Sequence, residues 1–235
     1  MSSFSRRQFL KLGLAGLAGL VAPTQFARAD DPGGAVTAVF SAKPRTPTVA
    51  LTFDDGYFNV ATLLDKCKEA DVRLTLFPIG KVIEARPEVW QRAVAQGHEI
   101  GCHSYFHQPL GGQPYEMVAN ELELFLKVAR KYLGNVPVRY FRPPYGSGWN
   151  DEALKAAARD FGMTVVMWNR VSPPSPTPGV KPTADDVLEA FRQQARSGDI
   201  FLYHFLWQEV GAFTDVVALC KLRGWKVGMV SEVLE

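Results

Sequence analysis

Short apolar runs and amphipathic segments alternate along the chain from about residue 48 to the C-terminus. The apolar runs, bounded by turn residues, predict buried strands at residues 48–53, 72–77, 98–102, 139–141, 163–168, 200–204 and 226–230. The segments between them have apolar residues at helical spacing and predict helices at residues 58–70, 87–96, 114–133, 151–160, 184–196 and 211–223. Repeated strand–helix units predict a single α/β domain with a parallel sheet covered by helices. Seven strands favour an incomplete barrel over an open sheet, although the count alone does not decide between them.

Polar residues with catalytic chemistry follow the ends of several predicted strands. They are Asp54 and Asp55 after the first strand, His103 and His107 after the third, Arg142 after the fourth, and His204 at the end of the sixth. In a parallel barrel these strand ends share one face, which is the usual place for an active site. We therefore expect these side chains to lie together.

Asp55, His103 and His107 form a candidate metal site. The two histidines are four residues apart, and on a helical turn that spacing puts both imidazoles on one side, where they can hold one metal. Asp55 could supply a third ligand. Two histidines and one carboxylate leave a position open for water on zinc, as catalytic sites do. Non-haem iron(II) oxygenases use the same three ligands, so the ligands alone do not identify the metal.

The N-terminal 29 residues have the pattern of an export signal. A basic stretch, Ser5-Arg6-Arg7-Gln8-Phe9-Leu10-Lys11, precedes a Gly/Ala/Leu-rich segment and the small-x-small site Ala27-Arg28-Ala29. The paired arginines resemble a twin-arginine signal, which predicts export by that machinery to the periplasm, cell envelope or medium. The apolar part is shorter than the ~18–20 residues that span a bilayer, so no membrane span is expected after cleavage. An uncleaved amphipathic anchor is the alternative.

The remaining chain is expected to comprise a linker at residues 30–47, rich in proline, glycine and alanine, and the catalytic domain at residues 48–235. Loss of residues 1–29 removes four basic and no acidic residues, so the formal net charge changes from +2 to −2. That balance argues against a nucleic-acid partner and suits a near-neutral one such as a glycan. Three cysteines are too few for a disulfide scaffold, and Cys102 is expected to be a buried apolar residue.

The ordered set of motifs resembles that of the polysaccharide deacetylase family, the NodB-homology or carbohydrate esterase family 4 domain, over roughly residues 46–235. The matching segments are Thr52-Phe53-Asp54-Asp55-Gly56, His103-Ser104-Tyr105-Phe106-His107, Arg142-Pro143-Pro144-Tyr145-Gly146 and Leu202-Tyr203-His204. The resemblance implies a distorted (β/α)7 barrel, which agrees with the seven predicted strands. It also implies a polysaccharide substrate, and a monomer is expected.

The resemblance further implies a role for each matching residue. Asp55, His103 and His107 would bind Zn2+ or another divalent ion such as Co2+ or Ni2+, which would activate a water molecule. Asp54 would be the general base, held in position and kept ionised by Arg142.

Tyr145 and His204 would complete the catalytic set. The Tyr145 backbone N–H would stabilise the oxyanion, and His204 would be the general acid that protonates the leaving amine. The products would be an amino sugar and acetate, from N-acetyl or O-acetyl groups of peptidoglycan, a chitin-like glycan or poly-N-acetylglucosamine. One departure concerns the fourth motif, where a carboxylate usually pairs with the acid histidine. Here Trp168 is followed by Asn169-Arg170-Val171-Ser172, which has no carboxylate.

Three other functions are weighed against this one. A glycoside hydrolase using Asp54 and Asp55 is a poor candidate, because neighbouring residues of a strand point to opposite faces and such enzymes need two carboxyls flanking one bond. A hydrolase of another amide, such as a ureide or cyclic imide, could use the same fold. A non-catalytic glycan-binding protein is favoured by the missing carboxylate and opposed by the presence of Asp54, Arg142 and His204.

Overall fold

The computed structural model describes residues 38–173 and 180–235, so the expected export signal lies outside the described residues. The strands in chain order are β1 (Thr48–Asp55), β2 (Thr75–Pro78), β3 (Glu99–Ile100), β4 (Tyr140–Phe141), β5 (Thr164–Val165), β6 (Arg170–Val171), β7 (Ile200–His204) and β8 (Lys226–Gly228). The helices are α2 (Val60–Ala70), α3 (Gly80–Ala85), α4 (Pro87–Ala95), α5 (Tyr115–Leu133), α6 (Glu152–Asp160), α7 (Ala184–Gln194), α8 (Trp207–Leu222) and α9 (Val230–Leu234), with a 3-10 turn η1 (Pro144–Gly146).

The strands form an incomplete barrel. One sheet has the order β3-β2-β1-β7-β6, with β8 pairing with the start of β1, and β4 pairs with β5. All these pairs are parallel. A bridge between Cys102 and Phe141 connects the two sheets, and Val39 pairs with Val166 just after β5. Val39 lies within the segment expected to be a linker, and here it hydrogen-bonds to the backbone of residues 165 and 167.

The central strand β1 has two buried faces. Val49, Leu51 and Phe53 belong to the large apolar cluster beneath the helices, whereas Ala50 belongs to a smaller cluster. This division follows from the alternation of side chains along a strand. The smaller cluster fills the barrel interior and consists of Ala50, Phe77, Tyr140, Val166, Ile200, Val230 and Val233. Thr52 and Asp54 lie on the same face as Ala50, so the strand carries them toward the carboxyl end of the barrel interior.

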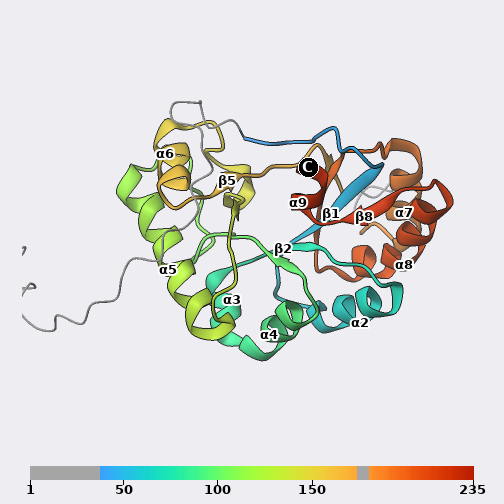
Figure 1. Ribbon diagram of the computed structural model, residues 1–235, viewed down its shortest axis with the longest axis horizontal. Helices are drawn as coiled ribbons and strands as arrows, with labels where there is room; N and C mark the ends of the chain where they lie inside the picture. Colours follow the sequence, from blue (N-terminus) through green and yellow to red (C-terminus); the bar gives the residue numbers. More distant parts are fainter. Residues whose placement is uncertain (1–37, 174–179) are drawn as a thin grey trace, which may run out of the picture. The chain divides into compact units, whose positions relative to one another are not determined.

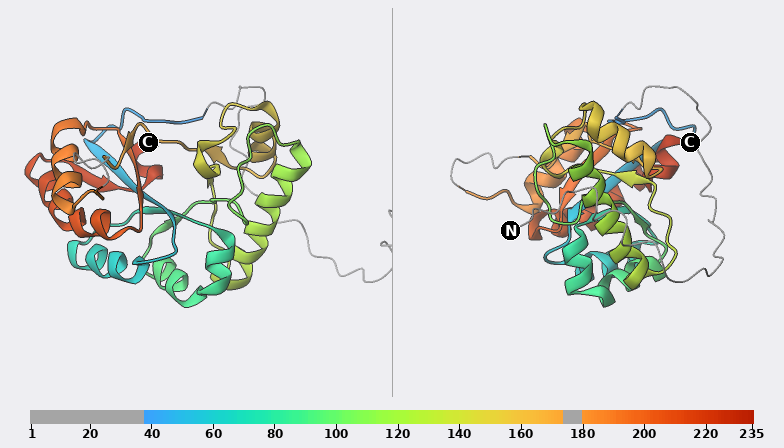
Figure 2. Two further views of the ribbon diagram at one scale, coloured as in Figure 1. Left: turned by 180° about the vertical axis from the view of Figure 1, so that it is seen from behind. Right: turned by 90° about the vertical axis from the view of Figure 1, so that its left-hand side faces the viewer.

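The helices lie around the strands. Figure 1 shows α9 beside β1, where its Val230 and Val233 join the interior cluster. The pairs α7–α8 and α5–α6 lie side by side, as the view from behind in Figure 2 also shows. No described helix is both long enough and apolar enough to cross a lipid bilayer.

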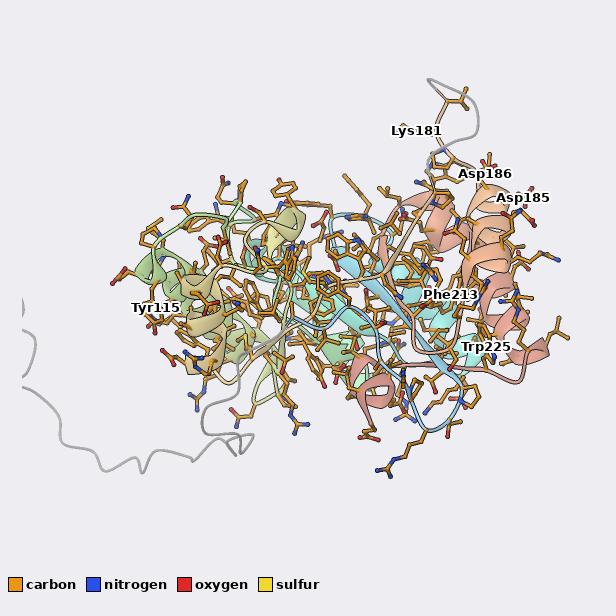
Figure 3. The ribbon with its side chains drawn as sticks, turned by 90° about the horizontal axis from the view of Figure 1, so that it is seen from above. Tyr115, Lys181, Asp185, Asp186, Phe213 and Trp225 are labelled. Atoms are coloured by element: carbon orange, nitrogen blue, oxygen red, sulfur yellow. The ribbon has the colours of Figure 1, made fainter. Side chains whose placement is uncertain are left out.

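Side-chain contacts explain two of these packings. Figure 3 shows Phe213 of α8 within the core, where its ring centroid lies 6.4 Å from that of Phe53. Tyr115, at the start of α5, donates from its hydroxyl to Asp160 of α6 at 2.9 Å. Asp185 and Asp186 lie in the first turn of α7, where the positive end of the helix dipole stabilises carboxylates.

The structure confirms the predicted fold class and changes several element bounds. The strand predicted at 98–102 is only Glu99–Ile100, and that predicted at 163–168 is only Thr164–Val165. Helices α3 and α9 were not predicted, because six and five residues are too few to show helical periodicity. Helix α8 begins at Trp207 rather than at 211, since its N-cap Leu206 offers no side-chain cap that would signal a start.

Replacing Gly56 with alanine is expected to destabilise the fold strongly. Gly56 has a φ of +94°, and a Cβ there would lie 2.2 Å from Cζ2 of Trp90, which is fully buried. Overpacking of this kind costs about 1–3 kcal/mol, and the left-handed backbone adds about 1 kcal/mol for a residue with a side chain. Urea denaturation would measure the loss in the free energy of unfolding.

Gly112→Ala is the matched control for this prediction. Gly112 also has a positive φ, +71°, but a Cβ there would have no atom within 4 Å. The control therefore reports the backbone strain alone. Equal losses in the two variants would show that Trp90 does not restrict this position.

Candidate active site

Asp54 and Arg142 form a buried ion pair at the carboxyl end of the barrel strands. Arg142 follows β4 and is fully buried, and its Nη1 donates to Asp54 Oδ1 at 2.8 Å. Nη1 also donates to Thr52 Oγ1 at 2.6 Å, while Nε and Nη2 donate to the carbonyls of Val166 and Met167 at 3.0 and 2.9 Å. Burial lowers the pKa of Arg142, and the charge and hydrogen bond of Asp54 oppose that change. These hydrogen bonds fix the guanidinium group, which in turn fixes Oδ1 of Asp54.

Asp55, His103 and His107 bring their ligand atoms together. Asp55 Oδ1 lies 3.1 Å from His107 Nε2 and 3.5 Å from His103 Nε2. One ligand atom from each residue lies within 4.8 Å of the other two. His103 Nδ1 lies 2.8 Å from the Arg142 carbonyl oxygen. An N–H at Nδ1 would donate to that carbonyl and leave the Nε2 lone pair facing Asp55, as in metal-binding histidines.

Asp55 has the properties of a metal ligand. Its Oδ1 is buried and has no hydrogen-bond partner among the described residues, and such an orphaned atom is costly unless something binds it. Burial raises the pKa of Asp55, but the close imidazoles of His103 and His107 outweigh burial and hold that pKa well below its usual value. An ionised carboxylate and two imidazoles suit a divalent transition metal.

The backbone at Asp55 explains how two neighbouring carboxylates reach one place. A regular strand would point Asp54 and Asp55 to opposite faces. Asp55 has a φ of 74°, in the left-handed region, so the chain turns at this residue. As a result Asp54 Oδ2 and Asp55 Oδ1 lie 3.8 and 3.5 Å from the same atom, His103 Nε2.

The histidine pair lies on a loop and not on the helical turn that was considered for its four-residue spacing. Residues 103–107 follow β3 without helical structure. Ser104 and His107 have φ values of 60° and 62°, and these left-handed residues fold the loop back so that the imidazole centroids lie 5.0 Å apart. Ser104 Oγ also accepts from the His107 backbone N–H at 3.0 Å.

Glu121 of α5 anchors this loop by hydrogen bonds to its backbone. Its Oε2 accepts from the backbone N–H groups of Tyr105 and Phe106 at 2.9 and 2.8 Å, and Glu121 is buried. Sequence reasoning missed Glu121. A signal was present, because Glu121 falls on the same apolar stripe of its helix as Val118, Leu122 and Phe125, and a charged residue at a core position needs a partner.

Tyr145 lies next to the histidine cluster. It is in the turn η1 with a left-handed backbone (φ 59°, ψ 10°). No hydrogen bond among the described residues uses its backbone N–H. The Tyr145 ring is exposed and its centroid lies 4.7 Å from that of His107. The Tyr145 side chain therefore lies beside the candidate metal ligand His107.

His204 ends β7 and is the strand partner of Asp54. Its backbone N–H donates to Glu209 Oε2 at 2.9 Å. Asn169 and Arg170 stand where a carboxylate was expected, and both donate to Asp199, at 2.6 and 2.9 Å. They therefore anchor the start of β7, whereas Glu209, which sequence reasoning missed, is the acidic residue bound to the backbone of His204.

Comparisons with known proteins identify the family of this chain. The family model "Polysaccharide deacetylase" matches residues 41–166. A chitooligosaccharide deacetylase of Sinorhizobium fredii is 34% identical over 67% of this chain and 72% of that protein. A peptidoglycan-N-acetylglucosamine deacetylase of Bacillus cereus is 29% identical over 79% of this chain and 87% of that protein.

A solved structure has the same fold. It is a mutant of a CE4 family pseudoenzyme with restored enzymatic activity, with a TM-score of 0.78 and 25% identity over 86% of this chain and 72% of that one. The matched family model covers more than half of this chain. This chain belongs to the polysaccharide deacetylase family.

Proposed function

We propose that this chain is an exported, divalent-metal-dependent deacetylase that hydrolyses N-acetyl groups of an N-acetylglucosamine-containing polysaccharide. The observation that carries the proposal is the meeting of Asp55, His103 and His107 beside the Asp54–Arg142 ion pair. A binding protein would need neither the buried base nor the ion pair that orients it.

Asp55, His103 and His107 would hold the metal ion, Zn2+ or another divalent ion. When bound, the ion supplies Lewis-acid polarisation of the acetyl carbonyl and a lowered pKa for a water molecule. His103 is kept in the ligating tautomer by its contact with the Arg142 carbonyl. Asp55 supplies the negative charge.

Asp54 would act as the general base. Arg142 fixes Oδ1, and Oδ2 remains on the side of the histidine cluster. Asp54 takes a proton from the attacking water as the water oxygen bonds to the acetyl carbon. The buried Arg142 guanidinium, 2.8 Å from Oδ1, fixes the orientation of the carboxylate for this step.

Tyr145 and His204 would complete the reaction. The Tyr145 N–H donates to the oxyanion that forms on the acetyl oxygen. His204 donates a proton to the sugar nitrogen as the carbon–nitrogen bond breaks, which releases acetate and a free amine. The pairing of His204 on β7 with Asp54 on β1 supports this role.

The choice of an N-acetylglucosamine glycan rests on two observations. Both relatives described above are named for N-acetylglucosamine glycans: chitooligosaccharide and peptidoglycan. Tyr57, Tyr145 and Trp207 follow or border the site residues and are 49%, 68% and 57% exposed. Exposed aromatic faces suit sugar rings. The pattern of residues 1–29 supports export toward such a glycan.

Acetate release from a substrate panel tests this function. Zinc-loaded protein should release acetate from at least one of chitooligosaccharide, peptidoglycan and poly-N-acetylglucosamine, and a chelator should abolish the release. Protein that binds a glycan on this panel but releases no acetate would support the non-catalytic alternative. Hydrolysis of a ureide or cyclic imide, with no acetate released from any glycan, would instead support a hydrolase of another amide.

A further inference from the structure

The loop that carries both candidate histidine ligands has an unfavourable backbone. Residues 103–107 form neither helix nor strand, and Ser104 and His107 have left-handed φ values of 60° and 62°. Such a backbone is unfavourable for residues with a side chain and persists only where surrounding contacts hold it. The contacts of this loop therefore decide where the two imidazoles lie.

One carboxylate oxygen of Glu121 holds the centre of the loop. Glu121 is 6% exposed, and its Oε2 accepts from the backbone N–H groups of Tyr105 and Phe106 at 2.9 and 2.8 Å. These two residues lie between the ligands His103 and His107 in the chain. Glu121 belongs to α5, which packs its apolar stripe into the core. A packed helix thus carries the group that holds the loop.

Helix α3 holds the same loop through other atoms. The Gly80 N–H donates to the Ser104 carbonyl at 3.0 Å, and the Lys81 N–H donates to the Tyr105 carbonyl at 3.2 Å. The Tyr105 hydroxyl donates to Glu84 Oε2 at 2.8 Å. Gly80 is so close that a Cβ there would lie 2.6 Å from Cδ2 of Tyr105 and 3.1 Å from its Cα. The loop is therefore held by its N–H groups from α5 and by its carbonyls from α3.

The bonds that shape the loop all join protein atoms, so they can form before a metal ion binds. Ligands that are already in place bind an ion without the entropic cost of ordering a loop. Loss of a supporting contact would then weaken metal binding even though all three ligands remain.

We propose that Glu121 is a positioning residue for the metal site, which fixes the backbone between His103 and His107 so that both imidazoles are in place before the ion binds. This inference rests on the proposed function, in which these histidines hold the metal ion. Glu121 acts through the loop backbone and touches no reacting atom. Because its partners are two backbone N–H groups, the role needs an acceptor oxygen and not a charge.

A purely structural role is the competing explanation, in which Glu121 stabilises the domain without setting the ligand geometry. Glu121→Ala removes the acceptor, whereas Glu121→Gln keeps an oxygen that can accept both N–H groups. Asp199→Ala is the matched control. Asp199 is also a buried carboxylate, 4% exposed, and accepts the Arg196 backbone N–H at 2.9 Å, but it precedes β7 at the end away from His204.

Amide hydrogen exchange and zinc affinity test the inference. In metal-free protein, the N–H groups of Tyr105 and Phe106 should be protected in the wild type and in Glu121→Gln, and should lose that protection in folded Glu121→Ala. Zinc affinity, from competition with a chelator, should fall about 10–100-fold in Glu121→Ala, the range for loss of a supporting partner of a metal ligand. It should stay at the wild-type value in Glu121→Gln and in Asp199→Ala.

Several results would overturn the inference. They are wild-type zinc affinity in folded Glu121→Ala, an equal loss in Asp199→Ala, and a loss in Glu121→Gln as large as that in Glu121→Ala. If Glu121→Ala does not fold, Gly80→Ala decides, because its Cβ displaces Tyr105 from the side of α3. Unchanged zinc affinity in Gly80→Ala would contradict the inference, as would unprotected Tyr105 and Phe106 N–H groups in the metal-free wild type.

These measurements are independent of the reaction. Zinc-loaded wild-type protein that releases no acetate from any glycan would overturn the proposed function, and the exchange and affinity data would still decide the role of Glu121. Acetate release by the wild type together with unchanged zinc affinity in Glu121→Ala would keep the function and overturn the inference.

Discussion

Asp54→Asn is expected to lower kcat/KM for deacetylation by about 10²–10⁴ and to leave zinc binding intact, because that range is typical for loss of a general base. Asparagine has nearly the same shape and keeps an oxygen that can accept from Arg142 Nη1, now 2.8 Å from Asp54 Oδ1. It cannot take a proton from water. The metal ligands Asp55, His103 and His107 are untouched, so the protein should still bind about one zinc ion.

Two measurements make this prediction sharp. Steady-state kinetics gives the loss in rate, and metal analysis after dialysis gives the zinc content. Because Asn leaves the buried Arg142 without its anion, and breaking a buried pair costs about 3–5 kcal/mol, the variant must also be shown to be folded by circular dichroism. Asp65→Asn is the control, since Asp65 is paired with Arg92 at the surface. Loss of zinc from Asp54→Asn would show that the assignment of base and ligand to the two aspartates is wrong.

The sequence predicted the central parts of the fold best. Strand β1 was found almost to its last residue because both of its faces are buried, which leaves a continuous apolar run. Helices α5 and α6 were found because each has a clear apolar stripe. The short outer strands β3 and β5 were overextended, since apolar residues such as Met163 and Met167 stay buried beyond the last ladder hydrogen bond.

The grouping of the site residues followed from topology and not from local spacing. His103 and His107 lie together because two left-handed residues fold the loop and Glu121 holds it. A four-residue spacing suggested a helix, and only tertiary structure reveals the loop. Glu209 was missed for a related reason. It is five residues beyond His204 and returns to it only because α8 begins immediately after β7.

His103→Ala is expected to weaken zinc binding by more than about 100-fold, beyond the 10–100-fold typical for loss of a supporting partner of a metal ligand. His103 is the buried member of the pair, with a side chain 4% exposed against 15% for His107. Its Nε2 faces both aspartates, and its Nδ1 is fixed on the Arg142 carbonyl. Alanine removes the ligand atom and leaves Asp55 and His107, which are too few to hold the ion tightly.

His98→Ala separates ligand loss from loss of a buried imidazole. His98 is also buried, but its Nδ1 accepts the Leu74 backbone N–H at 3.2 Å and burial lowers its pKa to about 4, so it is a neutral structural residue away from the cluster. Competition with a zinc chelator should give wild-type affinity for folded His98→Ala and for Asp54→Asn, and a large loss for His103→Ala.

Unchanged affinity in His103→Ala would remove His103 from the ligand set. The buried Asp55 oxygen, which has no partner among the described residues, would then require another explanation. Equal losses in the two histidine variants would instead mean that zinc binding reports on the packing of the domain and not on ligation by His103.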